Sequence, residues 1–383
     1  MTHSLYAHYW SIADQGPAAF ADDLRQGGYT AVSYAVTYHR VRQLLPSDPR
    51  RHIFFSDHSH AYFPARDHRY GRIRPRPSPL LGTGERFREL LSALEDRGLG
   101  LRAWVVGCHN TDLALAHPDC AIRNALGDVL PHHLCPSNPD VADYLVALLT
   151  DVAEQCHPSA FELEAFEFPG AFEHGAHHEM SGIPLDRFHS GLLALCFCPS
   201  CRGAAQAQGV DSDQLASDVG RQLARYLDTP AWLLTPQGEP GAAEAFAAAH
   251  PALATYRATQ AVTLVALDQR LRQAVAAVAP TRLLMIGHAE RAEPWADGVV
   301  VPSTPEAVNA ARTLLGAGKD IVCGIYPMAP RPMDPETIYR TMTACAAAGC
   351  SGFNYYNHAL MQRSTHQAIA AGITRLRDDP VRP

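Results

Sequence analysis

The sequence has no long uninterrupted apolar run and no concentration of basic charge. No window approaches the roughly eighteen consecutive apolar residues of a membrane-spanning helix, so we expect no transmembrane segment. The formal net charge is −7 and the arginines are scattered, which makes nucleic acid an unexpected partner. With 47% apolar and 19% charged residues, the composition excludes a disordered chain.

Two further signals are missing near the start of the chain. Residues Met1–Tyr9 lack the basic stretch, apolar core and cleavage site of a signal peptide, so we expect a cytoplasmic protein. No Gly-x-Gly-x-x-Gly follows the first expected strand, which argues against a dinucleotide-binding fold. The chain has ten cysteines, and in a cytosolic protein a tight cysteine cluster indicates a metal more often than disulfides.

Short segments rich in β-branched and aromatic residues alternate with helical patterns along the chain. This alternation is typical of parallel strands joined by crossover helices. Helical periodicity is clearest in residues 141–154, 261–278, 305–317 and 335–348. We expect eight strands, at Leu5–Trp10, Ala31–Tyr38, Leu101–Gly107, Ala160–Ala165, Arg282–His288, Gly298–Val301, Ile321–Tyr326 and Gly352–Tyr356.

This element order predicts an α/β protein of the (β/α)8 TIM barrel type, with an open doubly wound sheet as the alternative. For 383 residues, one barrel domain over residues 1–383 is the economical interpretation. Three connections are oversized and follow strands 2 and 4, where long loops of barrels usually shape the active site. They are insertions at about residues 40–84, 166–201 and 209–254.

A cysteine cluster predicts a metal site. Cys196, Cys198 and Cys201 lie within six residues, so a tight turn can direct three thiols to one point. Four thiolates around one Zn²⁺ form a closed structural site without the open position of a catalytic zinc. We expect Cys135 as the fourth ligand; Cys156 competes, but it lies late in an apolar helical pattern. The alternative is a set of reduced thiols without a metal.

The expected fourth strand contains acids in an otherwise apolar segment. Glu162 and Glu164 share one face, and Glu167 follows just before Pro169, where the strand can already have ended. A carboxylate at the carboxyl end of a barrel strand is well placed for general acid or base catalysis. We predict Glu164 and then Glu167 as catalytic residues. The alternative for Glu164 is an ion pair with an arginine inside the barrel.

A histidine-rich segment comes next. His174, His178 and Glu179 have a spacing that offers three ligands to a second metal, but they also suit a polar sugar-binding loop or a solvated loop. We predict His178 as a third catalytic residue that acts as a base or assists acid/base catalysis.

Polar or aromatic residues also follow most of the other expected strands. Such residues at the carboxyl ends of barrel strands converge on one pocket and suit a ligand covered with hydroxyl groups. Tyr6, His8 and Trp10 alternate along the first strand and either stack on a sugar ring or pack inward. We predict substrate contacts from His39, His109, Asn110, His288, Glu290, Tyr326 and Asn357.

Taken together, several of these motifs resemble the family 42 β-galactosidases. The motifs are His132-His-Leu-Cys135-Pro-Ser-Asn-Pro139, Phe161-Glu-Leu-Glu164 and Cys196-Phe-Cys198-Pro-Ser-Cys201. The resemblance implies a glycoside hydrolase barrel whose four thiols bind zinc, and it supports Cys135 as the fourth ligand. Residues 139–169 also resemble glycosyl-hydrolase-like barrel proteins that have Leu-Asp-Tyr, an aromatic residue and a proline, with Glu164 in place of the aspartate.

The chain differs from this family pattern at two positions. Family 42 enzymes have the acid/base glutamate directly after an asparagine, whereas this chain has Ala165-Phe166 and then Glu167. A retaining barrel glycosidase also needs a carboxylate at the end of strand seven, where this chain has Tyr326. Inversion or elimination is therefore the expected chemistry.

The sequence thus predicts a carbohydrate-active enzyme that cleaves a glycosidic or related bond, with Glu164 as the principal acid/base. Its expected partner is Glu167, Glu179 or Glu290. Two alternatives stay open: a metal-dependent sugar lyase or isomerase built on His174, His178 and Glu179, and a catalytically inactive sugar-binding barrel. The expected partner is a small-molecule carbohydrate or glycoside, and the sequence is compatible with a homo-oligomer.

Overall fold

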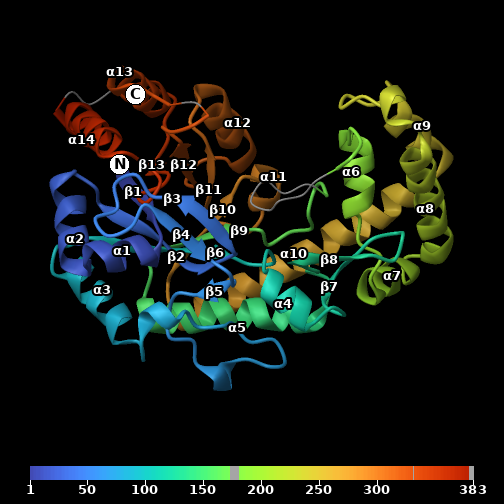
Figure 1. Ribbon diagram of the computed structural model, residues 1–383, viewed down its shortest axis with the longest axis horizontal. Coiled ribbons are helices and arrows are strands. Elements are labelled where there is room, and N and C mark those ends of the chain that lie inside the picture. The colour runs from blue at the N-terminus through green and yellow to red at the C-terminus, as the bar shows by residue number, and fades with distance from the viewer. Residues whose placement is uncertain (173–180, 331, 379–383) are drawn as a thin grey trace.

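The computed structural model describes residues 1–172, 181–330 and 332–378 (Figure 1). In these residues, parallel strands pair in chain order, and β1 pairs with both β2 and β13, which closes the ring. The predicted (β/α)8 barrel is confirmed. Its strands are β1 (Thr2–Ala7), β2 (Ala31–Tyr38), β6 (Gly100–Val106), β9 (Ala160–Glu164), β10 (Arg282–Ile286), β11 (Gly298–Pro302), β12 (Asp320–Ile325) and β13 (Gly352–Tyr355).

The first strand was expected too late in the sequence. Instead of Leu5–Trp10, the strand covers Thr2–Ala7, and helix α1 (Tyr9–Gln15) begins at Tyr9. The alternation of Tyr6, His8 and Trp10 was misleading because all three side chains are buried, whichever element they belong to. Trp10 stacks on Phe54 with a centroid distance of 4.6 Å, so inward packing describes these residues.

The barrel helices begin where the sequence offers capping residues. α5 (Pro139–Cys156), α12 (Pro305–Leu315) and α13 (Pro335–Ala347) each start with proline after a residue whose side chain accepts a backbone N–H. α10 (Ala252–Val278) starts at Ala252, earlier than the expected Ala261. Its first turns pack in a second hydrophobic core, described below. The other helices around the barrel are α2 (Pro17–Gln26), α3 (Glu85–Glu95), α4 (Thr111–Ala116), α11 (Ala289–Ala292) and α14 (Arg363–Asp378).

Among the described residues, no helix is both long enough and apolar enough to span a membrane.

The long connections contain short antiparallel elements. Between β2 and α3, strands β3 (Val41–Leu44) and β4 (Ile53–Ser56) form a hairpin, and β5 (His60–Ala61) pairs with β2. The same connection contains two 3-10 turns, at Asp67–Arg69 and Pro79–Leu81. A second hairpin, β7 (Ala121–Arg123) and β8 (Val129–Leu134), lies between β6 and α5, in a connection that the sequence did not single out as long.

The connection between β9 and β10 forms a helical lobe beside the barrel, on the right in Figure 1. The lobe has its own hydrophobic core, to which the β7–β8 hairpin contributes Ile122 and Leu130, and α10 contributes Leu253 and Tyr256. The four predicted zinc cysteines lie in this second core. The lobe consists of α6 (Arg187–Ala194), α7 (Pro199–Gln206), α8 (Ser212–Asp228), a 3-10 turn at Ala231–Leu233, and α9 (Ala242–Ala249).

A polar network crosses the interior of the barrel. Arg102 Nη1 donates to Glu162 Oε1 and to Asn354 Oδ1, each at 3.1 Å, and Asn354 Nδ2 donates to Glu162 Oε1 at 2.8 Å. The side chains of Arg102 and Glu162 are 7% and 0% exposed. The ion pair with an arginine inside the barrel, considered above for Glu164, is therefore formed by Glu162, the preceding residue on the same face of β9.

Removing Arg102 would leave the Glu162 carboxylate buried without its cation. We expect Arg102→Met to lower the free energy of unfolding by about 3–5 kcal/mol, measured by urea denaturation. The double variant Arg102→Met/Glu162→Leu should recover much of that loss, because no charge is left inside. Arg97→Met breaks the exposed pair with Asp22 and should have little effect. Similar losses for Arg102→Met and Arg97→Met would contradict the importance of the interior pair.

Candidate functional site

The carboxyl end of β9 brings Glu164 and Glu167 to one site. The strand ends at Glu164, and Ala165 adopts the left-handed conformation with φ 56°, which is uncommon for a residue with a side chain. The Cys108 N–H donates to the carbonyl oxygen of Ala165 at 2.6 Å. This turn ends the alternation of side chains along the strand before Glu167. The strand therefore ends before Glu167, as the sequence analysis allowed. The negative charge of Glu167 raises the pKa of Glu164.

Glu164 is poised to titrate near neutral pH. Burial raises its pKa to about 7, the hydrogen bond from Trp104 opposes this shift, and the charge of Glu167 adds to it. Trp104 Nε1 donates to Oε2 of the carboxyl group at 2.6 Å. A proton bound to Glu164 therefore belongs on Oε1, the oxygen that does not accept the Trp104 N–H.

Glu167 has the opposite electrostatic environment. Burial alone would raise its pKa, but the hydrogen bond and charge of His288, together with the charge of Arg291, outweigh it, and the pKa is lowered. His288 Nε2 lies 3.5 Å from Oε1, and Arg291 Nη1 lies 3.2 Å from Oε2. Arg291 is oriented by two hydrogen bonds to the buried Asp268. Both carboxylate oxygens of Glu167 thus face a cationic or protonatable group, so it stays ionised.

Aromatic side chains from four strand ends form an aromatic cluster around Glu164. The cluster consists of Tyr38, Trp104, Tyr326 and Tyr356. The ring centroids are 4.9 Å apart for Tyr38 and Trp104, 5.9 Å for Trp104 and Tyr356, and 5.2 Å for Tyr356 and Tyr326. Burial, with a contribution from the charge of Glu164, raises the pKa of Tyr326 and of Tyr356 to about 12. Their hydroxyl groups therefore stay neutral, and Tyr326 is 48% exposed at the open side of the barrel.

The residues predicted to contact the substrate have different surroundings in the structure. His288 contacts Glu167 of the carboxylate pair, and Tyr326 belongs to the aromatic cluster. Glu290 is exposed in the first turn of α11. His39 stacks on Tyr38 and on His109, with centroid distances of 4.3 Å in both cases.

The two predicted asparagines bond to the backbone instead. The Asn110 side chain caps α4 by accepting the Leu113 N–H, and Asn357 Oδ1 accepts the Ala359 N–H. These contacts support loops beside the site. The predicted catalytic residue His178, like His174 and Glu179, lies outside the described residues.

Sequence reasoning missed Trp104, Tyr356 and Arg291. A signal existed for Trp104, because it shares one face of its strand with Arg102 in the same way that Glu164 shares a face with Glu162. Tyr356 directly precedes the predicted Asn357. Arg291 gave no signal, because its role depends on Asp268 and Glu167, which lie far away in the sequence.

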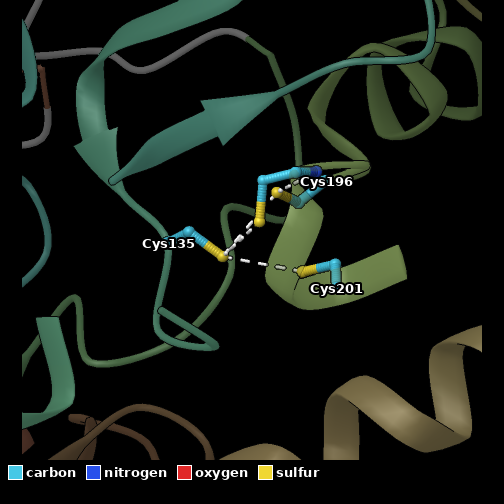
Figure 2. A group of neighbouring side chains, drawn as sticks. Cys135, Cys196 and Cys201 are labelled. Carbon is cyan, nitrogen blue, oxygen red and sulfur yellow. Dashed lines mark hydrogen bonds between the residues drawn. The ribbon is translucent and has the colours of Figure 1, made fainter. Parts of the chain in front are cut away.

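The four predicted cysteines come together in the helical lobe (Figure 2). Cys135 Sγ lies 3.7 Å from Cys196 Sγ, 3.5 Å from Cys198 Sγ and 3.6 Å from Cys201 Sγ. All four sulfur atoms are within 4.8 Å of one another and belong to buried residues. Thiolates about 2.3 Å from a tetrahedral metal are about 3.8 Å apart. The cluster can therefore bind one metal ion, and its spacing is far too long for S–S bonds.

Neighbouring groups hold the cysteine cluster in place. The Cys198 N–H donates to Cys196 Sγ at 3.5 Å, Gln260 Nε2 donates to Cys201 Sγ at 3.9 Å, and Tyr256 OH donates to the Cys196 carbonyl at 2.6 Å. Such outer contacts orient metal ligands. Cys156, the competing candidate, is the last residue of α5 and packs in the barrel core.

No protein-family model and no curated protein matches the sequence. Solved structures do match. The α-L-fucosidase isoenzyme 2 from Paenibacillus thiaminolyticus aligns with 98% of this chain and 49% of its own, at a TM-score of 0.58 and 14% identity. A β-galactosidase from the psychrophilic Marinomonas ef1 aligns with 98% of this chain and 60% of its own, at a TM-score of 0.59 and 10% identity.

The PgaB (BpsB) glycoside hydrolase domain from Bordetella bronchiseptica matches over nearly its whole length. It aligns with 97% of this chain and 99% of its own, at a TM-score of 0.57 and 14% identity. This chain therefore spans about half of the fucosidase and three fifths of the β-galactosidase, but almost all of the PgaB domain. At these identities, the comparisons establish a barrel fold shared with glycoside hydrolases.

The raised pKa of Glu164 predicts a pH-dependent stability. The folded protein keeps this proton up to about pH 7, whereas the ordinary pKa is 4.5, so the resulting stabilisation is present below pH 4.5 and is lost as the pH rises through 7. We expect Glu164→Gln to match the wild type at about pH 4 and to exceed it by up to about 3 kcal/mol at pH 8, measured by urea denaturation. Glu167→Gln should instead be destabilising at pH 8. A pH-independent effect of Glu164→Gln would contradict this environment.

The cysteine cluster predicts one bound metal ion per chain. We expect Cys135→Ser to lose the metal, measured by inductively coupled plasma mass spectrometry, and to unfold at a lower temperature, because metal binding stabilises the folded lobe. Cys156→Ser removes another buried thiol, outside the cluster, and should keep the metal. Equal metal contents in the two variants would rule out Cys135 as a ligand.

Proposed function

We propose that this protein is a carbohydrate-active enzyme of the glycoside hydrolase type, which cleaves a glycosidic or related bond by carboxylate acid/base catalysis. The main support is the pair of Glu164 and Glu167, whose pKa values are shifted in opposite directions at the carboxyl end of one barrel strand. Two carboxyl groups with separated pKa values supply an acid and a base at the same pH. The glycoside hydrolase folds of the structural neighbours agree with this proposal.

Glu164 is the proposed general acid. Its pKa of about 7 keeps it protonated in a large fraction of molecules near neutral pH, and Trp104 fixes the carboxyl group through Oε2. Oε1 then donates its proton to the oxygen of the leaving group as the glycosidic bond breaks. The neighbouring aromatic side chains contribute to the burial that raises the pKa of Glu164.

Glu167 is the proposed partner carboxylate. It is ionised, and His288 and Arg291 hold its two oxygens. In inversion, Glu167 accepts a proton from the water whose oxygen attacks the anomeric carbon, while the leaving group departs with the proton from Glu164; in elimination, Glu167 accepts the proton of an acidic sugar C–H instead. Residues 324–330, at the end of β12, include no acid, so the strand-seven nucleophile of retaining barrel enzymes is missing. We therefore propose inversion, or elimination, in place of double displacement.

The aromatic cluster around Glu164 suggests how a sugar is bound. Tyr326 and Tyr356 present apolar ring faces and neutral hydroxyl groups, which suit the C–H faces and hydroxyls of a pyranose. We propose direct contacts from His39, His109, His288, Glu290 and Tyr326. Asn110 and Asn357 act indirectly, because their side chains support backbone N–H groups.

We also propose that the metal of the cysteine cluster is a structural Zn²⁺. Four buried thiols at tetrahedral spacing fit zinc and leave no coordination position for a substrate. The ligands would be Cys135, Cys196, Cys198 and Cys201.

Turnover of a panel of aryl glycosides tests the proposal, with NMR reading the anomeric form of the first product. We expect kcat/KM to fall about tenfold per pH unit above pH 7, as Glu164 loses its proton. Glu164→Gln should lower turnover of phenyl glycosides by about 10²–10⁴-fold, but should affect 2,4-dinitrophenyl glycosides far less, because that leaving group needs no proton.

Glu336→Gln, on the exposed first turn of α13, is the matched control and should behave as wild type. An equal loss for both leaving groups would exclude Glu164 as the general acid. Binding of glycosides without turnover by the wild type would favour the sugar-binding barrel.

A further inference from the structure

A cavity of about 770 Å³ lies at the barrel mouth, outside the carboxylate pair. Its walls come from the end of β2, the β3–β4 hairpin, and the loops after β12 and β13. In the ring of strands, β13 lies opposite β9 and β1 lies opposite β10, so this cavity faces Glu164 and Glu167 across the mouth.

The cavity and the candidate active site share a wall at Tyr38. Tyr38 lines the cavity, its hydroxyl lies 3.3 Å from that of Tyr356, and its ring packs against Trp104, which binds Glu164. A substrate whose scissile bond lies at Glu164 therefore has room to extend past Tyr38 into the cavity.

The lining of the cavity combines aliphatic, polar and cationic side chains. Among the described residues that line it there is no Asp or Glu. Arg40 is paired with Asp112, whereas Arg42 is exposed and has no salt bridge within the described part of the chain. The polar part of the lining also includes His39, Gln43, Gln362 and Thr365. The aliphatic surface suits an apolar group, and Arg42, which has no salt bridge among the described residues, suits an anion beside it. The aliphatic lining includes Val41, Leu44, Pro46, Pro327, Met328 and Leu360.

The hairpin side of the cavity is preformed. Phe54 stacks on Trp10 at 4.6 Å, and Trp10 Nε1 donates to Gln43 Oε1 at 3.2 Å, which anchors both strands of the hairpin to the core. Leu44, on the opposite face, is 66% exposed. An anchored apolar surface of this kind binds a ligand with little cost of ordering.

We propose that this cavity binds the leaving-group part of the substrate, and that this part is an apolar group of aryl size with an anionic substituent that pairs with Arg42. The inference rests on the proposed function, because it assigns the cavity to the substrate of the same site. It adds a substrate class: glycosides of an acidic, apolar aglycone.

Equilibrium binding of 2-naphthoate and its neutral analogue 2-naphthamide tests the cavity without requiring turnover. By isothermal titration calorimetry, the wild type should bind naphthoate about fivefold more tightly, the value of a partly exposed ion pair. The preference should shrink in 0.5 M NaCl, because salt screens exposed charges. Arg42→Gln should abolish the preference, and Leu44→Ser should weaken both ligands.

Arg225→Gln is the matched control, because Arg225 is exposed on α8 in the helical lobe, away from the cavity. Equal affinities for the two ligands in the wild type would overturn the inference, as would a preference that survives in Arg42→Gln.

The same variants separate this inference from the proposed function. If no glycoside is turned over but naphthoate binding depends on Arg42, the glycosidase proposal fails and the anion-binding cavity stands. If glycosides are turned over, 4-carboxyphenyl glycosides should have a higher kcat/KM than phenyl glycosides, and Arg42→Gln should reduce that ratio about fivefold. Turnover with no such dependence would leave the glycosidase standing and remove the aglycone assignment.

Discussion

The parallel pairing of β6 with β9 is the constraint on which the site depends. In this register Trp104 lies opposite Glu162, and Val106 lies opposite Glu164. Inward-facing residues of barrel strands stack in layers, and here two layers have different roles. The inner layer joins Arg102, Glu162 and Asn354 in a polar network built on Glu162 Oε1, whereas the buried Oε2 has no hydrogen-bond partner among the described residues. The next layer places the indole N–H of Trp104 on Glu164, where the barrel opens. The polar network below it therefore supports the layer that contains the candidate acid.

The helical lobe and the barrel meet around the same strand. Cys135 comes just before α5, the helix that leads into β9, whereas Cys196, Cys198 and Cys201 belong to the connection that leaves β9. One metal ion bound by these thiols would join the chain entering β9 to the chain leaving it. The cysteine cluster lies in the lobe's own core, against which Phe168, the residue after Glu167, also packs. A structural metal in this place would fix the loops on both sides of the strand that presents Glu164 and Glu167.

Much of the fold could be predicted because periodicity is a local property. Eight strand segments and four long helices were found from it, and the cysteine spacing indicated the cluster. The β3–β4 and β7–β8 hairpins were missed, because their short strands lie in loops rich in histidine, arginine and proline, where alternation is weak. The first strand was misplaced for a related reason. Full burial of Tyr6, His8 and Trp10 hides the point at which the strand ends and α1 begins.

The sequence by itself determined the barrel, the four thiols of the cluster, and the presence of acids at the end of the fourth strand. Only the tertiary structure decided the environment of each acid. Glu162 is paired inside by Arg102, Glu164 is desolvated beneath aromatic rings, and Glu167 faces His288 and Arg291. The physical reason is that a pKa depends on burial and on nearby charges, and those come from strands far apart in the sequence. Spacing along one strand shows where carboxyl groups can lie, but it does not show what surrounds them.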